Sequence, residues 1–400
     1  MNILFLSELF YPHGGGAELA TYLYAKLLSQ KGFNVKVVTN RFAKELGASQ
    51  DRNLIVYRLP LFSGLGSKFS VLLKPEIIYS SFLRKLVNWA DAVYVPRRWF
   101  SAIPLAKAYK KPAIVHIHDF IPICPLSVLY DFTKNAICQN NASCSASCIY
   151  FFEMHRKRGL IKSVASMVAN QFFKKFANTI VKYADAIVCV SRAQRDILAK
   201  YDPRIAEKLR VIYNPLPNLQ PVDVNGHDFG YLGGKSPLKG FTVLQQALRE
   251  LKSLSIVIHA AGFSRLADEK IEEYKRLGML VYKRLNYSEQ EFFYRKIRGI
   301  VFPSIVLEPL PYTTAEALLR ARILIASRVG GILEQVAGCK GVFLFESGNY
   351  VELAETLRYV NDLSTEEATD LGLQNREVFT KTYKNEATIR KFTDLITSLI

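Results

Sequence analysis

Short apolar segments of β-forming residues alternate with longer amphipathic segments along this chain, and the series occurs twice. The apolar segments are residues 2–7, 34–39, 53–59, 91–95, 113–118 and 185–191, then 228–233, 254–261, 278–285, 299–304, 323–327 and 341–345. Between several of them lie stretches with apolar residues at helical spacing, such as residues 17–32, which stop at Gly32. Strands that alternate with helices are typical of mainly parallel sheets. The sequence therefore predicts an α/β protein with two doubly wound sheets.

A connector separates the two series. The segment "YNPLPNLQPVDVNGHD", residues 213–228, contains too many proline and asparagine breakers for a helix or strand. The 400 residues also suffice for two domains of roughly 200 residues each. We expect an N-terminal domain over 1–212, a linker over 213–226, a C-terminal domain over 227–380, and a helix over 381–400 that crosses back to the first domain. Ligands of such sheets bind at the carboxyl ends of strands, so we expect a site in the cleft between the domains.

Two glutamates lie eight positions apart in "SIVLEPLPYTTAEALL", residues 304–319. A strand pattern precedes them and a helical pattern follows, so Glu308 is expected in a strand-to-helix loop and Glu316 about one turn into the helix. The exposed N–H groups and positive end of a helix start favour anions such as phosphate. A purely structural alternative is that Glu308 caps the helix and Glu316 is a first-turn acid stabilised by the macrodipole.

The stretch that contains these glutamates, "PSIVLEPLPYTTAEALLRARILIASRVGGILEQV" at 303–336, resembles a family signature. Without gaps it is similar to the donor site of the GT-B glycosyltransferases of family 4, the group 1 retaining enzymes with an E-x(7)-E motif. The resemblance implies a GT-B fold, two Rossmann-like domains that face a cleft. It also implies that Glu308 contacts the transferred sugar and that Glu316 binds the ribose hydroxyls. The distal phosphate is then bound by backbone amides near Leu310, Pro311 and Tyr312.

A glycine-rich turn, "YLGGKSPLKGF", resembles the phosphate-binding turn of the same family, normally Gly-Arg-x-x-x-x-Lys-Gly. Lys239 and Gly240 match the Lys-Gly pair, and the resemblance gives Lys239 the leaving phosphate. Gly234 stands in place of the family arginine. Lys235, one position later, offers a point charge instead of a planar fork. Without the motif, Lys239 is an ordinary solvated lysine.

The first apolar segment is followed by "PHGGGAELATYL". Glycines allow positive φ and close approach of the backbone to a ligand, and they also form ordinary turns. The segment resembles the first glycine-rich loop of the family, which assigns Gly15 and Gly16 to donor binding.

A His-Asp pair ends the expected strand "AIVHIH" at His118 and Asp119. The resemblance places His118 against the donor sugar beside the reaction centre, as a catalytic residue. The residues alone leave open that this histidine belongs to the core.

The resemblance implies a retaining, hexosyltransferase-like enzyme that moves a sugar from a nucleotide diphosphate sugar to an acceptor hydroxyl. Attack is expected on the face that the leaving group departs from, with the departing phosphate taking the acceptor proton. Metal-independent chemistry is expected because no Asp-x-Asp occurs in the sequence. The donor is UDP-, GDP- or ADP-linked, and the acceptor is a glycan or a lipid-linked precursor. An alternative is an inactive paralogue that binds a sugar nucleotide or a partner, suggested by Gly234, Ala321 and Ile323.

Four of the six cysteines fall within 25 residues, at Cys124, Cys138, Cys144 and Cys148. Four thiolates match a closed tetrahedral zinc site, although the usual C-x(2)-C spacing is missing. Two disulfides or unpaired thiols are the alternatives. We expect a structural zinc and no catalytic cofactor.

Positive charge is concentrated in the first half. Residues 1–200 hold 27 Lys and Arg against 11 Asp and Glu, so they carry a net charge of +16 of the chain's +18. Basic residues alternate with apolar ones in 63–90 and 155–183, as in interfacial helices, although helices that pack on the sheet are the alternative. No apolar run suits a membrane span, and the N-terminus lacks a basic leader. We expect a cytoplasmic protein, peripheral at the inner face of an anionic membrane; a nucleic-acid-binding protein is a weaker alternative because no binding module occurs.

Overall fold

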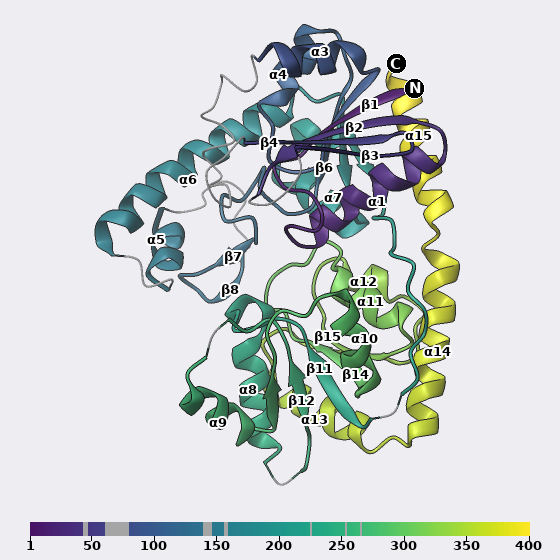
Figure 1. The fold of residues 1–400 in the computed structure, drawn as a ribbon. Helices are drawn as coiled ribbons and strands as arrows, with labels where there is room; N and C mark the ends of the chain where they lie inside the picture. Colours follow the sequence, from purple (N-terminus) through teal and green to yellow (C-terminus); the bar gives the residue numbers. More distant parts are fainter. Residues whose placement is uncertain are drawn as a thin grey trace. The chain divides into compact units, whose positions relative to one another are not determined.

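The computed structural model describes residues 1–42, 47–60, 80–138, 146–155, 159–224, 226–252, 254–264 and 266–400. The chain forms two compact units (Figure 1). Unit 1 contains residues 1–216 and 384–400, and unit 2 contains residues 217–383.

Unit 1 is built on an eight-stranded sheet, counted over its described residues, with the order β10-β9-β6-β5-β1-β2-β4-β3. Its strands are parallel except β3, which runs antiparallel to β4. They are β1 (Asn2–Leu6), β2 (Asn34–Asn40), β3 (Ala48–Asp51), β4 (Leu54–Leu59), β5 (Ala92–Val95), β6 (Ala113–Ile117), β9 (Ala186–Cys189) and β10 (Leu209–Val211). A small antiparallel pair, β7 (Tyr130–Asp131) and β8 (Ala136–Ile137), lies apart from this sheet.

The helices of unit 1 lie between its strands along the chain, except α15, which follows unit 2. They are α1 (Gly16–Gln30), α3 (Ser81–Trp89), α4 (Ala102–Ala108), α5 (Ala146–His155), α6 (Leu160–Val181), α7 (Arg192–Tyr201), the 3₁₀ helix η1 (Pro203–Lys208) and α15 (Asn385–Leu399). The helix α1 ends near Gly32, whose φ of +88° is the left-handed conformation that favours glycine at a helix end. The expected glycine stop is confirmed.

The helix α15 completes the core of unit 1, although the whole of unit 2 precedes it in the chain (Figure 1, yellow). The ring of Phe392 lies 4.9 Å from that of Tyr24 and 5.0 Å from that of Tyr94. Ile389 and Ile396 are buried in the same apolar cluster. The apolar face of α15 therefore packs on α1 and the central strands.

Unit 2 holds a six-stranded, fully parallel sheet among its described residues, in the order β13-β12-β11-β14-β15-β16. Its strands are β11 (Asp228–Tyr231), β12 (Ile258–Ala260), β13 (Met279–Val281), β14 (Ile297–Phe302), β15 (Ile323–Ser327) and β16 (Val342–Phe345). Its helices are η2 (Pro237–Lys239), α8 (Phe241–Glu250), α9 (Asp268–Lys275), α10 (Tyr287–Arg295), α11 (Tyr312–Leu319), α12 (Ile332–Gln335), α13 (Tyr350–Asn361) and α14 (Thr365–Thr382). The central strands β14 and β15 are buried throughout, as expected for a sheet covered on both faces.

Two buried arginines that the sequence patterns did not reveal stabilise unit 2. Arg298, on β14, donates from Nη1 to the carbonyl oxygens of Val360, Asn361 and Leu363 at 2.8–3.1 Å. Arg322, before β15, donates to the carbonyl oxygens of Val222 at 2.7 Å and Asp223 at 3.1 Å. Each guanidinium thus replaces its lost hydration with backbone acceptors.

None of the helices in the described part of the chain has the length and apolar character needed to cross a bilayer.

Candidate functional site

The loop between β14 and α11 holds a buried carboxylate. Oε1 of Glu308 accepts hydrogen bonds from Nζ of Lys239 at 2.7 Å and from Oγ of Ser304 at 2.8 Å. The Glu308 side chain is 9% exposed, whereas that of Lys239 is 42% exposed. Lys239 therefore connects a fixed, buried anion to the solvent-facing side of the loop, where its ammonium remains accessible to a second anion.

Gly240 explains how Lys239 reaches this loop. Its φ is +76°, and a Cβ atom at this position would lie 1.7 Å from the carbonyl oxygen of Pro303. The turn from η2 into α8 therefore packs directly on the backbone that follows β14. The amide of Ile305 donates to the carbonyl oxygen of Leu238 at 3.1 Å, which fixes the two segments to each other. The Lys-Gly pair is thus a sequence signature of close backbone contact.

A second glycine pair holds the backbone of Glu308 from the other side. The amide of Gly331 donates to the carbonyl oxygen of Glu308 at 2.8 Å. Gly330 has a φ of +54°, and a Cβ atom there would lie 2.3 Å from the same oxygen. The "SRVGG" segment is therefore a support for the loop, and only glycine fits at position 330 without a backbone shift.

The helix α11 begins directly after this loop, with Pro311 as its N-cap residue. Gln335 donates from Nε2 to the carbonyl oxygen of Pro311 at 3.1 Å, and Thr314 donates from Oγ1 to the same oxygen at 2.8 Å. Both bonds fix the direction of the helix start. The first N–H groups of any helix lack intrahelical acceptors, and with the macrodipole they favour an anion. Leu310, Pro311 and Tyr312 are half-buried at this helix start.

Glu316 lies on the first turn and a half of α11 and is buried. Burial raises the pKa of its carboxyl, and Arg320, with Nη1 at 3.7 Å from Oε2, opposes that rise. The Arg320 guanidinium also lies 4.3 Å from the centre of the Tyr294 ring. Glu316 is therefore directed by a cation on its own helix, whereas the partners of Glu308 come from η2 and from its own loop.

Gly234 has a conformation that excludes the arginine expected from the family pattern. Its φ is +56°, and a Cβ atom would lie 2.5 Å from the carbonyl oxygen of Gly262. Its amide donates to the carbonyl oxygen of Ala261 at 3.0 Å, so the close approach is fixed by a hydrogen bond. The next residue, Lys235, is exposed. The missing guanidinium thus has a local backbone cause.

Unit 1 has its own cluster at the carboxyl ends of β1 and β5. The amide of Gly15 donates to Oε2 of Glu18 at 2.6 Å, and this bond closes the start of α1. Arg97, two residues after β5, forms an ion pair with Glu18, and its Nε lies 3.5 Å from Oε1 of Glu8. Burial lowers the pKa of Arg97, and Glu8 raises it. Two buried carboxylates therefore hold one arginine beneath the glycine loop of residues 14–16.

His118 follows β6. Its ring stacks on that of His116 with centroids 4.3 Å apart, and Nδ1 of His116 is hydrogen-bonded to the Tyr94 hydroxyl at 2.6 Å. Burial and the positive charge of Arg97 lower the pKa of His118 to about 3, although Asp119 opposes them. Its Nε2 is buried and has no hydrogen-bond partner among the described residues. His118 is thus a neutral imidazole with one nitrogen available.

The predicted residues therefore divide between the units. Lys239 and Glu308 are in contact; Gly234, Lys235, Glu316 and the α11 start lie in unit 2, and Gly15, Gly16 and His118 lie in unit 1. The sequence patterns missed Glu8, Glu18 and Arg97. Their positions in the sequence could have identified them, because each lies within a few residues of a strand end or a helix start, where ligands of parallel sheets are bound.

The structural zinc site expected at the four clustered cysteines stays a prediction. Cys144 lies outside the described residues. The other three cysteines of the cluster, Cys124, Cys138 and Cys148, are described, and Sγ of Cys148 donates to the Tyr130 carbonyl oxygen at 3.5 Å. Within the described ranges no group of three or more His, Cys, Asp or Glu residues is placed to hold a metal ion.

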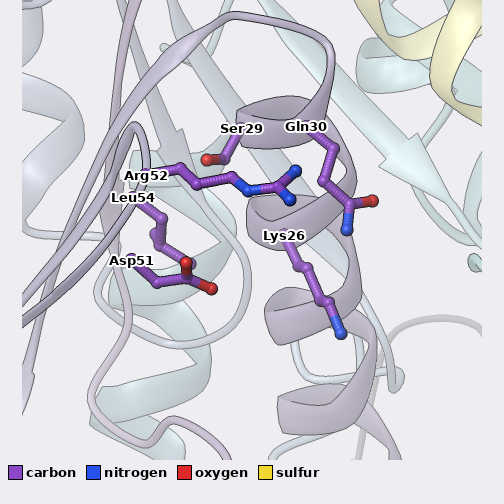
Figure 2. A pocket seen from close by; sticks show the side chains of 6 residues that line it. All are labelled: Lys26, Ser29, Gln30, Asp51, Arg52 and Leu54. Carbon is purple, nitrogen blue, oxygen red and sulfur yellow. The ribbon is translucent and has the colours of Figure 1, made fainter.

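A separate pocket of about 220 Å³ lies at the other end of α1 (Figure 2). Lys26, Ser29 and Gln30 of α1 line it, together with Asp51, Arg52 and Leu54 from the β3–β4 turn. Because α1 begins at Gly16, this pocket is remote from the glycine loop and does not belong to the candidate site.

Comparisons with known proteins agree with this geometry. The model of the family described as Glycosyltransferase Family 4 matches residues 14–217, and the model described as Glycosyl transferases group 1 matches residues 226–362. An uncharacterized 42.6 kDa protein in the cps region of Klebsiella pneumoniae is 24% identical over 349 residues, which are 84% of this chain and 87% of that protein.

Solved structures show the same fold. Sucrose-phosphate synthase from Thermosynechococcus elongatus has a TM-score of 0.73 at 14% identity, covering 100% of this chain and 98% of the other. HepE from Anabaena, in complex with UDP-glucose, has a TM-score of 0.68 at 15% identity, covering 100% of both chains. The expected GT-B architecture of two Rossmann-like domains is confirmed.

Proposed function

Because this chain belongs to glycosyltransferase family 4, with a group 1 glycosyltransferase match over its second unit, we propose that it transfers a sugar from a nucleotide diphosphate sugar to an acceptor hydroxyl. The observation that carries the proposal is the contact of Lys239 with Glu308 beside the start of α11. A cation and a helix start suit the diphosphate of an activated sugar, and a carboxylate suits hydrogen bonding to its hydroxyls.

Unit 2 binds the donor in this proposal. The diphosphate accepts hydrogen bonds from Lys239 and from the first amides of α11, near Leu310, Pro311 and Tyr312. These groups stabilise the negative charge that grows on the leaving phosphate, and they are fixed before the reaction begins. Gly234 and Lys235 complete the phosphate turn. Glu316, on α11, binds the hydroxyls of the ribose.

The chemistry retains the anomeric configuration. The bond between the anomeric carbon and the phosphate oxygen breaks, the acceptor oxygen bonds to the same face of that carbon, and the acceptor proton passes to the departing phosphate. This path needs no carboxylate nucleophile, unlike a retaining glycosidase. Lys239 and Ser304 hold Glu308 for hydrogen bonding to the sugar, so Glu308 positions the substrate.

Unit 1 supplies the acceptor side together with His118, Gly15 and Gly16, which contact the donor sugar. A neutral imidazole is supported by the lowered pKa of His118, and its buried Nε2 is able to exchange one hydrogen bond with a sugar hydroxyl. We propose a lipid-linked or other membrane-associated glycan precursor as acceptor, since the first 200 residues carry a net charge of +16. The protein then works at the cytoplasmic face of a membrane.

A second candidate is an inactive paralogue that binds a sugar nucleotide without turnover. The conformation of Gly234 favours it, because the backbone excludes the guanidinium that the family pattern places at this position. Lys235 is exposed and provides only a point charge as a substitute.

Two measurements test the proposal. A thermal-shift screen of UDP-, GDP- and ADP-sugars identifies the donor, because a ligand at 100 times its Kd stabilises by about 2.7 kcal/mol. UDP-sugars come first, since HepE is described in complex with UDP-glucose. Release of the nucleoside diphosphate is then followed with and without EDTA. Turnover that EDTA does not reduce supports a metal-independent enzyme. Binding of a sugar nucleotide without turnover supports the inactive paralogue, and the absence of any binding overturns both candidates.

A further inference from the structure

The helix α6 has one face buried in unit 1 and a second face with exposed apolar side chains. The inward face is buried in unit 1 and consists of Ser163, Asn170, Phe173, Ala177 and Val181. The second face carries a line of apolar side chains at helical spacing: Ile161 is 85% exposed, Val164 43%, Val168 61% and Phe172 61%. Steps of three, four and four residues place these four side chains in one stripe along the helix.

The stripe is part of a larger surface. Further exposed apolar side chains are Leu160, at the start of α6, and Phe151 and Met154 on α5, the helix that packs on α6. The helix α5 packs on α6, and Ser166 of α6 donates to Oε1 of Glu153 of α5 at 2.6 Å (Figure 1). We name these seven residues, Phe151, Met154, Leu160, Ile161, Val164, Val168 and Phe172, the α5–α6 apolar surface. They are 7 of the 17 large exposed apolar residues of the described chain, so apolar exposure is concentrated here.

The charges around this surface have one sign. Three lysines of α6 flank the stripe: Lys162 and Lys175 are exposed and Lys174 is half-buried. The sequence of α6 contains no acidic residue. The acidic residue of α5, Glu153, is buried and hydrogen-bonded to Ser166. Within the described residues of α5 and α6, the exposed charges beside the apolar stripe are therefore all positive.

We propose that the α5–α6 apolar surface docks on an anionic lipid bilayer. A bilayer surface of this kind offers apolar depth for the stripe and negative headgroups for the lysines. A second copy of the chain fits less well, because two such surfaces bring like charges together. A nucleic acid fits less well because it has no apolar interior into which Ile161 or Phe172 could insert. The inference extends the proposed membrane-associated acceptor by assigning the surface that meets the membrane.

Vesicle sedimentation with the full chain tests this assignment. One set of vesicles contains phosphatidylcholine only, and the other adds phosphatidylglycerol as the anionic lipid, at roughly one third of the lipid. We expect the chain to sediment with the anionic vesicles. It should bind neutral vesicles at least about tenfold more weakly, because the attraction between the lysines and anionic headgroups is lost. Raised salt should weaken binding to the anionic set.

Three variants locate the contact. Ile161→Ser/Val168→Ser/Phe172→Ser removes the stripe at solvent-exposed positions, and Lys174→Glu/Lys175→Glu reverses two charges. Both should reduce vesicle binding by about tenfold or more. The matched control is Phe292→Ser, which changes an equally exposed apolar side chain in unit 2. It should bind like the wild type. A thermal melt of each variant confirms that unit 1 remains folded.

Three results would overturn the assignment. The first is a wild-type chain that stays in the supernatant with anionic vesicles, and the second is a folded triple variant that sediments like the wild type. The third is vesicle-independent dimerisation that the triple variant abolishes, since this identifies the surface as a contact between copies. Nucleotide release with a water-soluble acceptor separates this inference from the proposed function: the triple variant should keep that activity, whereas an inactive chain that still binds vesicles contradicts only the function.

Discussion

Lys239 and Glu308 are 69 positions apart in the chain, and Nζ of the lysine lies 2.7 Å from Oε1 of the glutamate. Two backbone contacts produce this pair. Gly240 packs on the carbonyl oxygen of Pro303, and Gly331 donates to the carbonyl oxygen of Glu308. The pair is therefore a property of the scaffold and is formed before any donor binds.

Replacement of Lys239 tests its role toward the leaving phosphate. Lys239→Met should reduce kcat by about 10²- to 10³-fold, as for the loss of one transition-state donor. The fold should persist, because Ser304 still donates to the carboxylate of Glu308. Initial rates of nucleotide release measure the effect. Lys252→Met is the matched control at an exposed lysine of unit 2 to which the proposal gives no role, and an equal loss in both variants would contradict the assignment to Lys239.

Substitution of each of the two glutamates should impair a different step. Glu316→Gln should weaken donor binding by about 10- to 100-fold, since a charged hydrogen bond to the ribose contributes about 1.5–3 kcal/mol. Glu308→Gln should mainly lower kcat, because that carboxylate is directed at the transferred sugar. Calorimetric titration with the donor and steady-state kinetics separate the two. Wild-type activity in both variants refutes the site.

The backbone conformation of Gly234 predicts that an arginine at this position destabilises the protein. Gly234→Arg should lower stability by about 1–3 kcal/mol, the usual range for strain at a backbone conformation that non-glycine residues rarely adopt. The cause is the φ of +56° and the carbonyl oxygen of Gly262, at 2.5 Å from the added Cβ. Lys235→Arg, which places a guanidinium at an exposed position, should leave the melting temperature unchanged. A Gly234→Arg variant that is fully stable and faster would show that the turn adapts.

Acid should destabilise unit 1 through His118. Its pKa in the folded chain is about 3, below the ordinary value of 6.5, so only the unfolded chain gains a proton between these values. This contribution to stability is fully present above pH 6.5 and is lost as the pH falls toward 3. His118→Gln should therefore flatten the fall of the melting temperature between pH 7 and 4. An identical pH profile in both proteins would show that the imidazole is solvated.

The sequence predicted the strands of both sheets well. All twelve apolar segments named from the sequence overlap a strand, because buried parallel strands require continuous runs of β-branched and aromatic residues. The short strands β3, β7, β8 and β10 were missed. The exposed "ASQD" of β3 has no apolar pattern, and its pairing with β4 depends on the hairpin partner.

The candidate site was predictable in part. The strand-to-helix loop that holds Glu308 and Glu316 was visible in the residue pattern, and the family resemblance of the Lys-Gly turn singled out Lys239. Pairing was not visible: the ion pair of Arg97 with Glu18 joins residues 79 positions apart through the fold of unit 1. The φ of Gly234 was also inaccessible, because it depends on the backbone of Gly262. Sequence identifies residue types at strand ends, and only the fold decides which of them meet.

The position of α15 also constrains how the chain folds during synthesis. Its Phe392 fills the core between Tyr24 and Tyr94, yet Asn385 is translated 169 residues after Leu216, to which its side chain bonds. At about 5–20 residues per second, a ribosome needs roughly 8–35 seconds to pass through unit 2. During that interval the nascent first sheet keeps an open apolar groove where the helix belongs, so a chaperone that binds such a groove has a defined window in which to act.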